Sequence, residues 1–290
     1  MHQVRIGVIG GSGMYAIDGL TDVESCLPET PFGRPSDEIV MGRLAGTQLF
    51  FLPRHGRGHV ISPSELPSQA NIWALKMLGV THIISISAVG SLQLPLAPRH
   101  IVLPDQLIDR TKGLRPASFF GGGVVAHIAF AEPYCHELRR IVYGAAQEIM
   151  GDAVHNGGTL VVMEGPQFST RAESRMYRQI GGDLIGMTAL PEAKLAREAG
   201  ICYCTLAMVT DYDSWHDAEE AVTVDMVVDN MAANTEHARA IIAASAPRIA
   251  SMAGECACHD ALRNAIITHA EAIPPERKAL LWPLIGPYLS

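Results

Sequence analysis

The sequence predicts an α/β fold: a single domain with a mixed, mostly parallel central sheet flanked by helices. Two observations lead to this prediction. Short apolar runs alternate along the chain with longer stretches in which apolar residues recur at helical spacing. The apolar runs also lack polar residues at every second position, which is typical of strands that helices cover on both faces.

The predicted strands are apolar runs rich in β-branched residues, too short to be membrane-spanning helices. Most end in glycines, hydroxyl residues or charged residues, and these mark where each strand stops. The last run, for example, ends directly at Asp211. The runs cover residues 4–11, 47–56, 81–91, 100–108, 159–166, 183–188 and 201–211.

The predicted helices lie between these strands and have apolar residues on one face. They cover residues 68–78, 133–150, 169–180, 191–199 and 218–246. Residues 110–126 are irregular and Gly-rich, and loops of this length in compact domains are often functional. A mobile surface loop is the alternative interpretation.

We expect residues 1–250 to form the main part of the domain and residues 251–290 to be a C-terminal helical extension of the same domain. A chain of 290 residues is within the range of one α/β domain. The extension is too short to build a core of its own. Its pattern predicts one helix over residues 260–272, before Pro274 and Pro275.

Composition excludes several classes of protein. Hydrophobic residues make up 48% and charged residues 18%, which is globular and not disordered. The net charge is −8 without runs of like charge, so we expect no nucleic-acid partner and no binding to anionic membranes. The N-terminus lacks a signal-peptide pattern, and no apolar run approaches the ~20 residues that span a bilayer. These features predict a cytoplasmic protein.

Six cysteines are spread thinly along the chain, so a disulfide scaffold is not required. Cys256-Ala-Cys258 could be a metal or redox pair. No second Cys/His pair stands at zinc-site spacing, however, and ordinary thiols are the simpler interpretation. We therefore expect no metal site. The cysteines are Cys26, Cys135, Cys202, Cys204, Cys256 and Cys258.

Three predicted strand ends carry groups suited to an anion. Glycines around Ser12 would let backbone N–H groups approach a phosphate, although the segment matches neither a Walker loop nor a complete dinucleotide motif. Arg54, His55, Arg57 and His59 crowd the next strand end, where arginine offers a fork for two phosphate oxygens. Residues 85–91 add hydroxyl groups at a third strand end. Each segment has an alternative interpretation: a tight turn around Ser12, a solvated basic turn at residues 54–59, and hydroxyls bonded within their own turn at residues 85–91.

Two other strand ends suit a planar, hydrogen-bonding ligand. Phe168 and Ser169 join a strand to a helix, so the ring could stack on a ligand, although phenylalanine is usually a core residue. Asp211 and Asp213 follow the last strand, and residues two apart point to the same face. A protonated carboxyl group can donate to a ring nitrogen and accept from an amine, which would read an adenine edge. A solvated turn or a helix cap is the alternative.

Several segments together resemble the trimeric type of the purine nucleoside phosphorylase superfamily, from about residue 6 to residue 247. This resemblance implies a phosphorylase/hydrolase-like fold. The sequence departs from the family pattern in two places. At position 12 it has serine where many relatives have threonine, and the tail from Ser251 matches no common pattern. The matching segments are IGVIGGSG (6–13), TPFGRPSD (30–37), RHGRGH (54–59), QANIWALK (69–76), SAVGSL (87–92), EGPQFSTRAES (164–174), GMTALPEA (186–193) and ICYCTLAMVTDYDSW (201–215).

The resemblance implies roles for individual residues. Phosphate would be held by Ser12, Arg54, His55, Ser87, Ala88 and Thr188. The base and ribose would lie near Phe168, Ser169, Met187 and His59, with Asp211 and Asp213 as the catalytic pair at the N7 and 6-amino side. An apolar pocket for a 5′-methylthio group would consist of Val224, Val227 and Val228, with His127 supplied by a neighbouring subunit.

The implied reaction is phosphorolysis of S-methyl-5′-thioadenosine to adenine and 5-methylthioribose 1-phosphate, by a homotrimer. Asp211 favours a 6-amino purine, because relatives specific for 6-oxopurines are expected to carry asparagine there. No metal or organic cofactor is implied, and phosphate is a co-substrate. Three alternatives stay open: broader specificity for adenosine or 6-oxopurine nucleosides, a hydrolase that uses water, and a non-catalytic nucleoside-binding protein.

Overall fold

The computed structural model describes residues 4–11, 13–216, 224–252 and 256–289, and in residues 224–229, 231 and 232 it describes the backbone alone. The strands are β1 (Arg5–Gly10), β2 (Thr21–Cys26), β3 (Ile39–Leu44), β4 (Thr47–Pro53), β5 (His82–Ser91), β6 (Ile101–Leu103), β7 (Gln106–Arg110), β8 (Val154–Asn156), β9 (Thr159–Met163), β10 (Leu184–Gly186) and β11 (Cys202–Asp211). The helices are α1 (Ser68–Met77), α2 (His136–Met150), α3 (Arg171–Gln179), α4 (Ala189–Glu198), α5 (Val224–Ala250) and α6 (Pro275–Ile285).

The strands form one mixed sheet, as predicted. Its order is β2-β3-β4-β1-β5-β10-β9-β7, and β11 pairs with both β5 and β6. The pairs β1–β4, β1–β5, β5–β11, β9–β10, β7–β9 and β6–β8 are parallel, whereas β2–β3, β3–β4, β5–β10 and β6–β11 are antiparallel.

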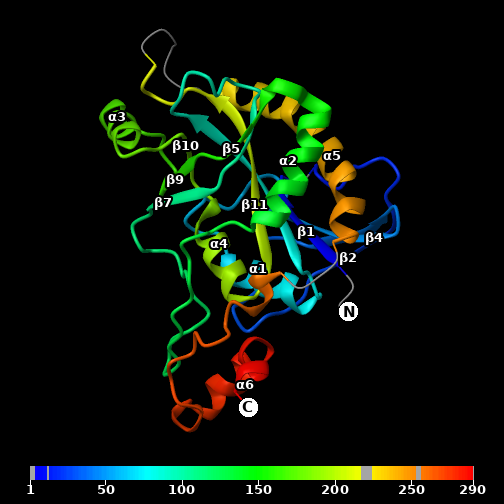
Figure 1. Ribbon diagram of the computed structural model, residues 1–290, viewed down its shortest axis with the longest axis vertical. Helices are drawn as coiled ribbons and strands as arrows, with labels where there is room; N and C mark the ends of the chain where they lie inside the picture. The colour runs from blue at the N-terminus through cyan, green and yellow to red at the C-terminus, as the bar shows by residue number, and fades with distance from the viewer. Residues whose placement is uncertain (1–3, 12, 217–223, 253–255, 290) are drawn as a thin grey trace.

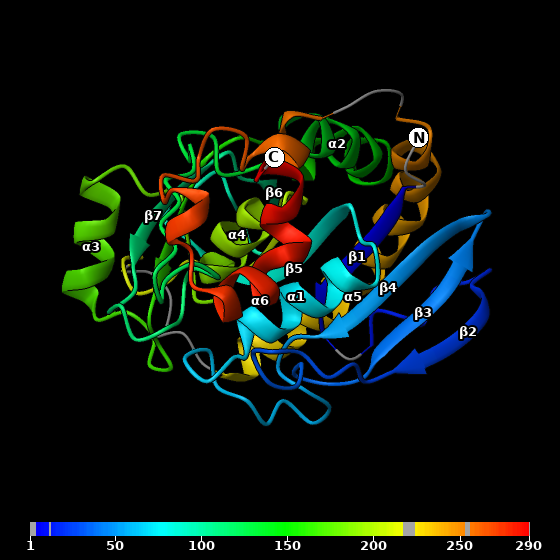
Figure 2. The ribbon, with the colours of Figure 1, turned by 90° about the horizontal axis from the view of Figure 1, so that it is seen from below.

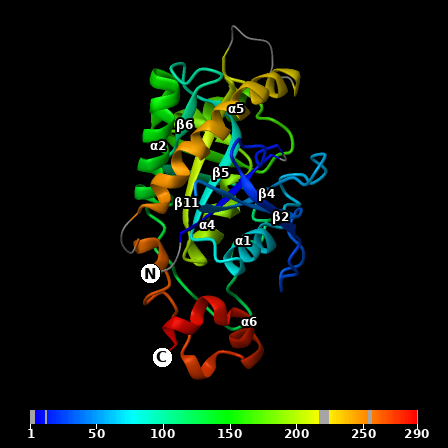
Figure 3. The same cartoon turned by 90° about the vertical axis from the view of Figure 1, so that its right-hand side faces the viewer.

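Helices cover both faces of the sheet, which explains why its central strands are apolar on both sides. Helices α2 and α5 lie on one face, and α1 and α4 lie on the other (Figures 1 and 3). Alternate residues of β4 show the division, because Leu49 and Phe51 pack toward α2 and α5 while Phe50 and Leu52 pack toward α1 and α4. In the part of the chain that the structure describes, no helix combines the length and apolarity needed to cross a bilayer.

Strand β5 is where the sheet divides. On one side it pairs with β11 from His82 to Gly90. It also pairs with β1 over His82–Ser85 and with β10 at Gly90 and Ser91. The parallel strands β1, β4, β5 and β11 all end at this edge of the sheet, and ligands in α/β proteins bind beyond such carboxyl ends. The fold therefore brings together the strand ends that the sequence marked for function.

The strand prediction is wrong at residues 100–108. This run forms two strands, β6 and β7, which lie on either side of Pro104 and Asp105 and pair with different partners. Proline has no N–H to donate, so one continuous ladder cannot run through it. The sequence prediction also omitted β2, β3 and β8. Strand β2 lies at the edge of the sheet and is almost entirely exposed, so it has no apolar run to reveal it.

The predicted helix over residues 260–272 is also wrong. Short 3-10 turns occupy Ala257–Asp260 and Ala270–Ala272, and Asn264 between them has a left-handed φ of 63°. The segment instead pairs with the long loop, through an Ala126–Ile266 bridge. The α-helix of this region is α6, which begins at Pro275, a favoured first helical residue.

Helix α6 packs on the same face of the sheet as α1. Its Leu281, Leu284 and Ile285 belong to the core cluster that contains Ile72 and Trp73 of α1. Viewed from below, α6 lies over α1 (Figure 2). It is at the opposite end of the molecule from the carboxyl ends of β5 and β11 (Figure 1).

Candidate active site

Arg54 follows β4 and is buried beneath the strand ends. Its side chain is 3% exposed and forms a two-point ion pair with Glu192 of α4, at 2.5 Å from Nε to Oε1 and 3.1 Å from Nη2 to Oε2. Nη2 also donates to Ser85 Oγ, and Nη1 donates to the Ile86 carbonyl. Burial alone would lower the pKa of Arg54, but the Glu192 carboxylate outweighs burial and raises it.

This arrangement differs from the open guanidinium fork that the sequence suggested. Glu192 neutralises the charge of Arg54 and occupies the edge that would face an anion. Glu192 is not among the predicted site residues, because a single glutamate in a helix has no local signal. The expected contact between Arg54 and phosphate stays a prediction.

Two of the predicted phosphate ligands do meet. Ser87 Oγ and Thr188 Oγ1 lie 3.1 Å apart, although the residues are 101 positions apart in the chain. Thr188 is the residue before the first turn of α4, and its hydroxyl makes no capping bond there. Ala88, next to Ser87 on β5, is half-buried. Two hydroxyls therefore face each other just before α4, where the backbone at Leu190 is still extended, and both can donate to an anion.

His55 and His59 also come together. Their rings are stacked with centroids 4.2 Å apart, and Gly56 and Gly58 between them take left-handed φ values of 70° and 81°. His55 Nδ1 is 2.8 Å from the Ile61 carbonyl, so that nitrogen carries the proton and Nε2 can accept one. Burial lowers the pKa of His55 to about 4, so the ring is neutral near pH 7.

The carboxylates of Asp211 and Asp213 lie at the end of β11, where the register with β5 shifts. Asp211 is 5% exposed and Asp213 8%. Asp211 Oδ1 accepts the Asp213 backbone N–H at 2.8 Å, and its Oδ2 accepts the Thr210 hydroxyl at 2.7 Å. A Cβ atom on Gly90 would lie only 2.9 Å from Asp211 Oδ1 and 3.3 Å from Asp213 Cβ. Glycine at position 90 thus leaves room for both residues.

Asp213 has the chemistry that base recognition needs. Burial raises the pKa of Asp213, and within the described residues its Oδ2 is buried without a hydrogen-bond partner. Such an atom costs free energy unless a ligand pairs with it. Its backbone φ of 50° is unusual for a residue other than glycine and costs further free energy. The site therefore holds a buried oxygen that can pair with an N–H donor.

The loop after β9 lies beside this carboxylate pair. Ser214, next to Asp213, donates from Oγ to the Ser169 carbonyl at 2.8 Å. Ser169 is 7% exposed, whereas Phe168 is 45% exposed and so presents a free aromatic surface. Predicted base contacts from residues 168–169 and from residues 211–213 are therefore neighbours in space.

A second buried ion pair, which the sequence analysis missed, fixes the long loop. Arg115 is 8% exposed, and its Nε donates to Glu164 Oε1 at 2.8 Å. Glu164 Oε1 also accepts from Ser64 Oγ. The Arg115 guanidinium donates to the carbonyls of Met187 and Leu190. The irregular stretch expected at residues 110–126 is therefore ordered against the backbone of Met187, the expected ribose contact.

Some predicted site residues lie elsewhere or cannot be described. Ser12 and the side chains of Val224, Val227 and Val228 lie outside the described residues. His127 is exposed, and its N–H donates to the Ala265 carbonyl in the C-terminal extension, away from the strand ends. The role of His127 at a neighbouring subunit's site stays a prediction.

Groups of metal-ligating side chains occur in the described part of the chain, but not at these strand ends. They consist of cysteines and histidines at the amino end of β11, and they are treated below. What the strand ends offer instead is a pair of hydroxyls on one side and a pair of buried carboxylates on the other. Such an arrangement can bind an anion next to a molecule with N–H donors.

The sequence of the chain is similar to those of known phosphorylases. The model of the phosphorylase superfamily matches residues 5–246. The chain is 56% identical over 290 residues to an S-methyl-5′-thioadenosine phosphorylase from Chloroflexus aurantiacus, covering 100% of both chains.

Two solved structures are also similar. One is a methylthioadenosine phosphorylase from an Antarctic soil metagenomic library, with a TM-score of 0.92, 49% identity and coverage of 98% of this chain and 99% of that one. The other is a mutant adenosine/methylthioadenosine phosphorylase from Schistosoma mansoni in complex with adenine, with a TM-score of 0.81, 40% identity and coverage of 86% and 93%.

Proposed function

The chain belongs to the phosphorylase superfamily, and from this premise we propose that it is an S-methyl-5′-thioadenosine phosphorylase. The enzyme is a pentosyltransferase. It transfers the 5-methylthioribosyl group of S-methyl-5′-thioadenosine from adenine to inorganic phosphate. The products are adenine and 5-methylthioribose 1-phosphate.

One structural observation supports this assignment best. The hydroxyl pair of Ser87 and Thr188 and the carboxylate pair of Asp211 and Asp213 lie at the ends of β5 and β11, which are hydrogen-bonded neighbours. A phosphorolysis site needs an anion on one side of the sugar and contacts to the leaving base on the other. Neighbouring strands carry both kinds of group.

The reaction develops opposite charges on its two sides. As the bond between C1′ and N9 lengthens, the sugar gains cationic character and the purine becomes negative. A phosphate oxygen bonds to C1′, and the purine keeps the electron pair of the broken bond. The purine takes up one proton, which balances the proton that hydrogen phosphate loses on becoming the sugar phosphate dianion.

On the base side, we assign the carboxylate pair to the purine N7 and 6-amino group. Asp213 has a raised pKa and an oxygen without a partner, which suits a group that shares a proton with the leaving purine or accepts from its amine. Phe168 has an exposed ring that can stack on the purine. Ser169 and Met187 border the same space, with Met187 and His59 on the ribose side.

On the phosphate side, Ser87, Ala88 and Thr188 are proposed to bind the anion through hydroxyl and backbone groups. His55 is neutral, so its Nε2 can accept a hydrogen bond from the O–H of hydrogen phosphate without taking the proton. Ser12 and Arg54 complete the proposed set. Arg54 would act largely by holding Glu192 and the strand ends in place, because its strongest contacts are to that carboxylate.

The remaining parts of the proposal rest on family resemblance. Val224, Val227 and Val228 would surround the methylthio group, and His127 would reach the site of a neighbouring subunit in a homotrimer. The chemistry above needs no metal or organic cofactor, since phosphate is the second substrate. We propose a cytoplasmic location.

Initial rates test the assignment. Methylthioadenosine, adenosine, methylthioinosine and inosine are each assayed with and without inorganic phosphate. We expect fast, phosphate-dependent cleavage of methylthioadenosine and loss of about one to two decades in efficiency with a 6-oxo base, because a buried polar group is then left unpaired. Turnover without phosphate would favour a hydrolase. Absence of turnover would favour a binding protein, and equal rates with inosine would favour an enzyme for 6-oxopurine nucleosides.

A further inference from the structure

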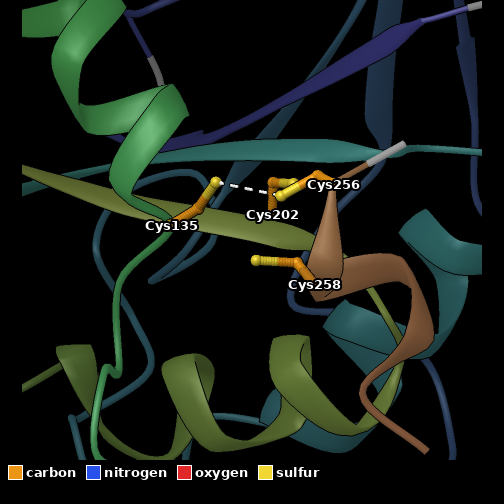
Figure 4. A group of neighbouring side chains, drawn as sticks. All are labelled: Cys135, Cys202, Cys256 and Cys258. Atoms are coloured by element: carbon orange, nitrogen blue, oxygen red, sulfur yellow. Dashed lines mark hydrogen bonds between the residues drawn. The ribbon is translucent and has the colours of Figure 1, made fainter. Parts of the chain in front are cut away.

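Four cysteines from three distant segments meet at the amino end of β11. Cys135 precedes α2, Cys202 is the first residue of β11, and Cys256 and Cys258 belong to the C-terminal extension. Their sulfur atoms all lie within 4.8 Å of one another. Figure 4 shows the side chains directed toward a common centre. All six cysteines of the chain have free thiols in the structure, so this cluster is not held by disulfides.

The sulfur spacing fits a tetrahedral metal ion. Zinc binds thiolates at about 2.3 Å, which puts two sulfur ligands of a tetrahedron about 3.8 Å apart. The Sγ atoms of Cys135 and Cys256 are 3.7 Å apart. Three of the four cysteines are buried and Cys256 is half-buried, so a bound ion would be shielded from water. Four ligands without an open position are typical of a structural zinc site.

The surroundings can stabilise thiolates. Cys135 is the N-cap of α2, and its Sγ accepts from the Leu138 backbone N–H at 3.5 Å, where the helix dipole favours negative charge. His259 Nδ1 lies 2.9 Å from the Gly200 carbonyl and so carries a proton, and His259 Nε2 lies 3.9 Å from Cys202 Sγ. The His259 ring therefore lies against the cluster, with Nε2 as the ring nitrogen nearest Cys202.

From these contacts we propose that Cys135, Cys202, Cys256 and Cys258 form a structural site for one zinc ion. Binding would release the thiol protons and form four zinc–sulfur bonds, with no change in oxidation state. The site would join the C-terminal extension to α2 and β11. The sequence hid this site because its ligands come from three segments, and Cys135 and Cys256 are 121 positions apart.

A second ligand set overlaps the first. His82, Cys202 and His259 also place three ligand atoms within 4.8 Å, and His82 Nε2 is buried without a partner in the described chain. This set offers three ligands and shares Cys202 with the cysteine cluster. The four thiols are favoured because they complete a tetrahedron without a solvent ligand.

The inference is independent of the proposed function. Cys202 and Asp211 are at opposite ends of β11, so the cluster is about 30 Å from the carboxylate pair. A site there would stabilise the fold without taking part in the reaction. Metal binding and turnover can therefore be measured separately.

Cobalt(II) substitution tests the proposal. The full chain is stripped of metal with a chelator, kept reduced with a phosphine, and titrated with cobalt(II) alone. We expect saturation at about one ion per chain, with the sulfur-to-cobalt charge-transfer absorption and visible bands of a tetrahedral thiolate site. Zinc should displace the cobalt and raise the melting temperature of the stripped protein. Absence of the charge-transfer band, or a melting temperature that zinc does not raise, would overturn the proposal.

Matched variants locate the site. Cys256→Ser and Cys258→Ser should each weaken cobalt binding at least tenfold and abolish the zinc-dependent rise in melting temperature. Cys26→Ser and Cys204→Ala remove the two cysteines outside the cluster and should bind cobalt as the parent does. If Cys256→Ser and Cys258→Ser bound cobalt like the parent, the four-thiolate site would be excluded in favour of the set with two histidines.

Discussion

The guanidinium of Arg54 and the carboxylate of Glu192 form a two-point ion pair across 138 positions of the chain, almost completely removed from water. This contact joins the end of β4 to the first turn of α4, directly beneath the proposed phosphate site. The Tyr203 hydroxyl and Ser85 Oγ also donate to Glu192 Oε2, at 3.1 Å and 3.0 Å. The pair therefore positions Thr188 and Ser87 relative to each other.

Removing one partner should destabilise the fold. Arg54→Ala leaves the Glu192 carboxylate buried without its cation, which typically costs about 3–5 kcal/mol of unfolding free energy. The double variant Arg54→Met with Glu192→Leu should lose less than the sum of the two single changes, because no charge is left unpaired. Urea denaturation of Arg54→Ala, of Arg54→Met and Glu192→Leu singly, and of the double variant measures both effects. Additive losses would show that the two groups do not interact.

Deleting the hydroxyl of Thr188 should weaken phosphate binding. Hydrogen bonds to a charged group contribute about 1.5–3 kcal/mol, so Thr188→Val should raise the phosphate KM by about tenfold or more. Binding of methylthioadenosine, measured by calorimetry, should change much less. Ser245→Ala, which removes a buried hydroxyl from α5, serves as the control. Equal phosphate saturation in Thr188→Val and the parent would remove Thr188 from the anion site.

Changing Asp211 to asparagine should alter the choice of base. The amide can donate to a 6-oxo group or to N7, whereas the carboxylate favours a 6-amino group. Asp211→Asn should therefore shift the kcat/KM ratio of methylthioadenosine to methylthioinosine toward the 6-oxopurine by about one decade. The same ratio in both proteins would mean that Asp211 does not read the base.

Glu198 should make stability depend on pH. Burial raises its pKa from 4.5 to about 7, although it accepts from Ser118 Oγ and the Phe119 N–H in the long loop. Because the folded chain holds this proton more tightly than the unfolded chain does, the stabilisation is complete below about pH 4.5 and is lost as the pH rises through about 7.

The test compares unfolding free energies of the parent and Glu198→Gln from pH 5 to pH 8. Glutamine cannot ionise, so the stability of the parent relative to the variant should fall across this range and level off above it. Glu271→Gln, at an exposed position of the C-terminal extension, should give a difference that does not change with pH. A constant difference for Glu198→Gln would contradict the assignment.

Local signals were sufficient for the central strands and for five of the helices. The runs at β1, β4, β5, β9, β10 and β11 are apolar because both faces are covered, and this pattern is visible without the fold. Strand β2 is missed for the opposite reason, since an exposed edge strand has polar residues throughout. The stretch at residues 260–272 has a helical pattern, but pairing with the long loop overrides it.

The sequence by itself determined the fold class, the family and which strand ends carry functional groups, because each depends on residues that are close together in the chain. Tertiary structure alone decided the pairing of Arg54 with Glu192, of Ser87 with Thr188 and of Cys135 with Cys256. These partners are separated by 100 or more positions, and only the order and register of the strands bring them within reach. Burial, which sets the pKa of Asp213 and Glu198, likewise depends on what packs around a residue and not on its neighbours in sequence.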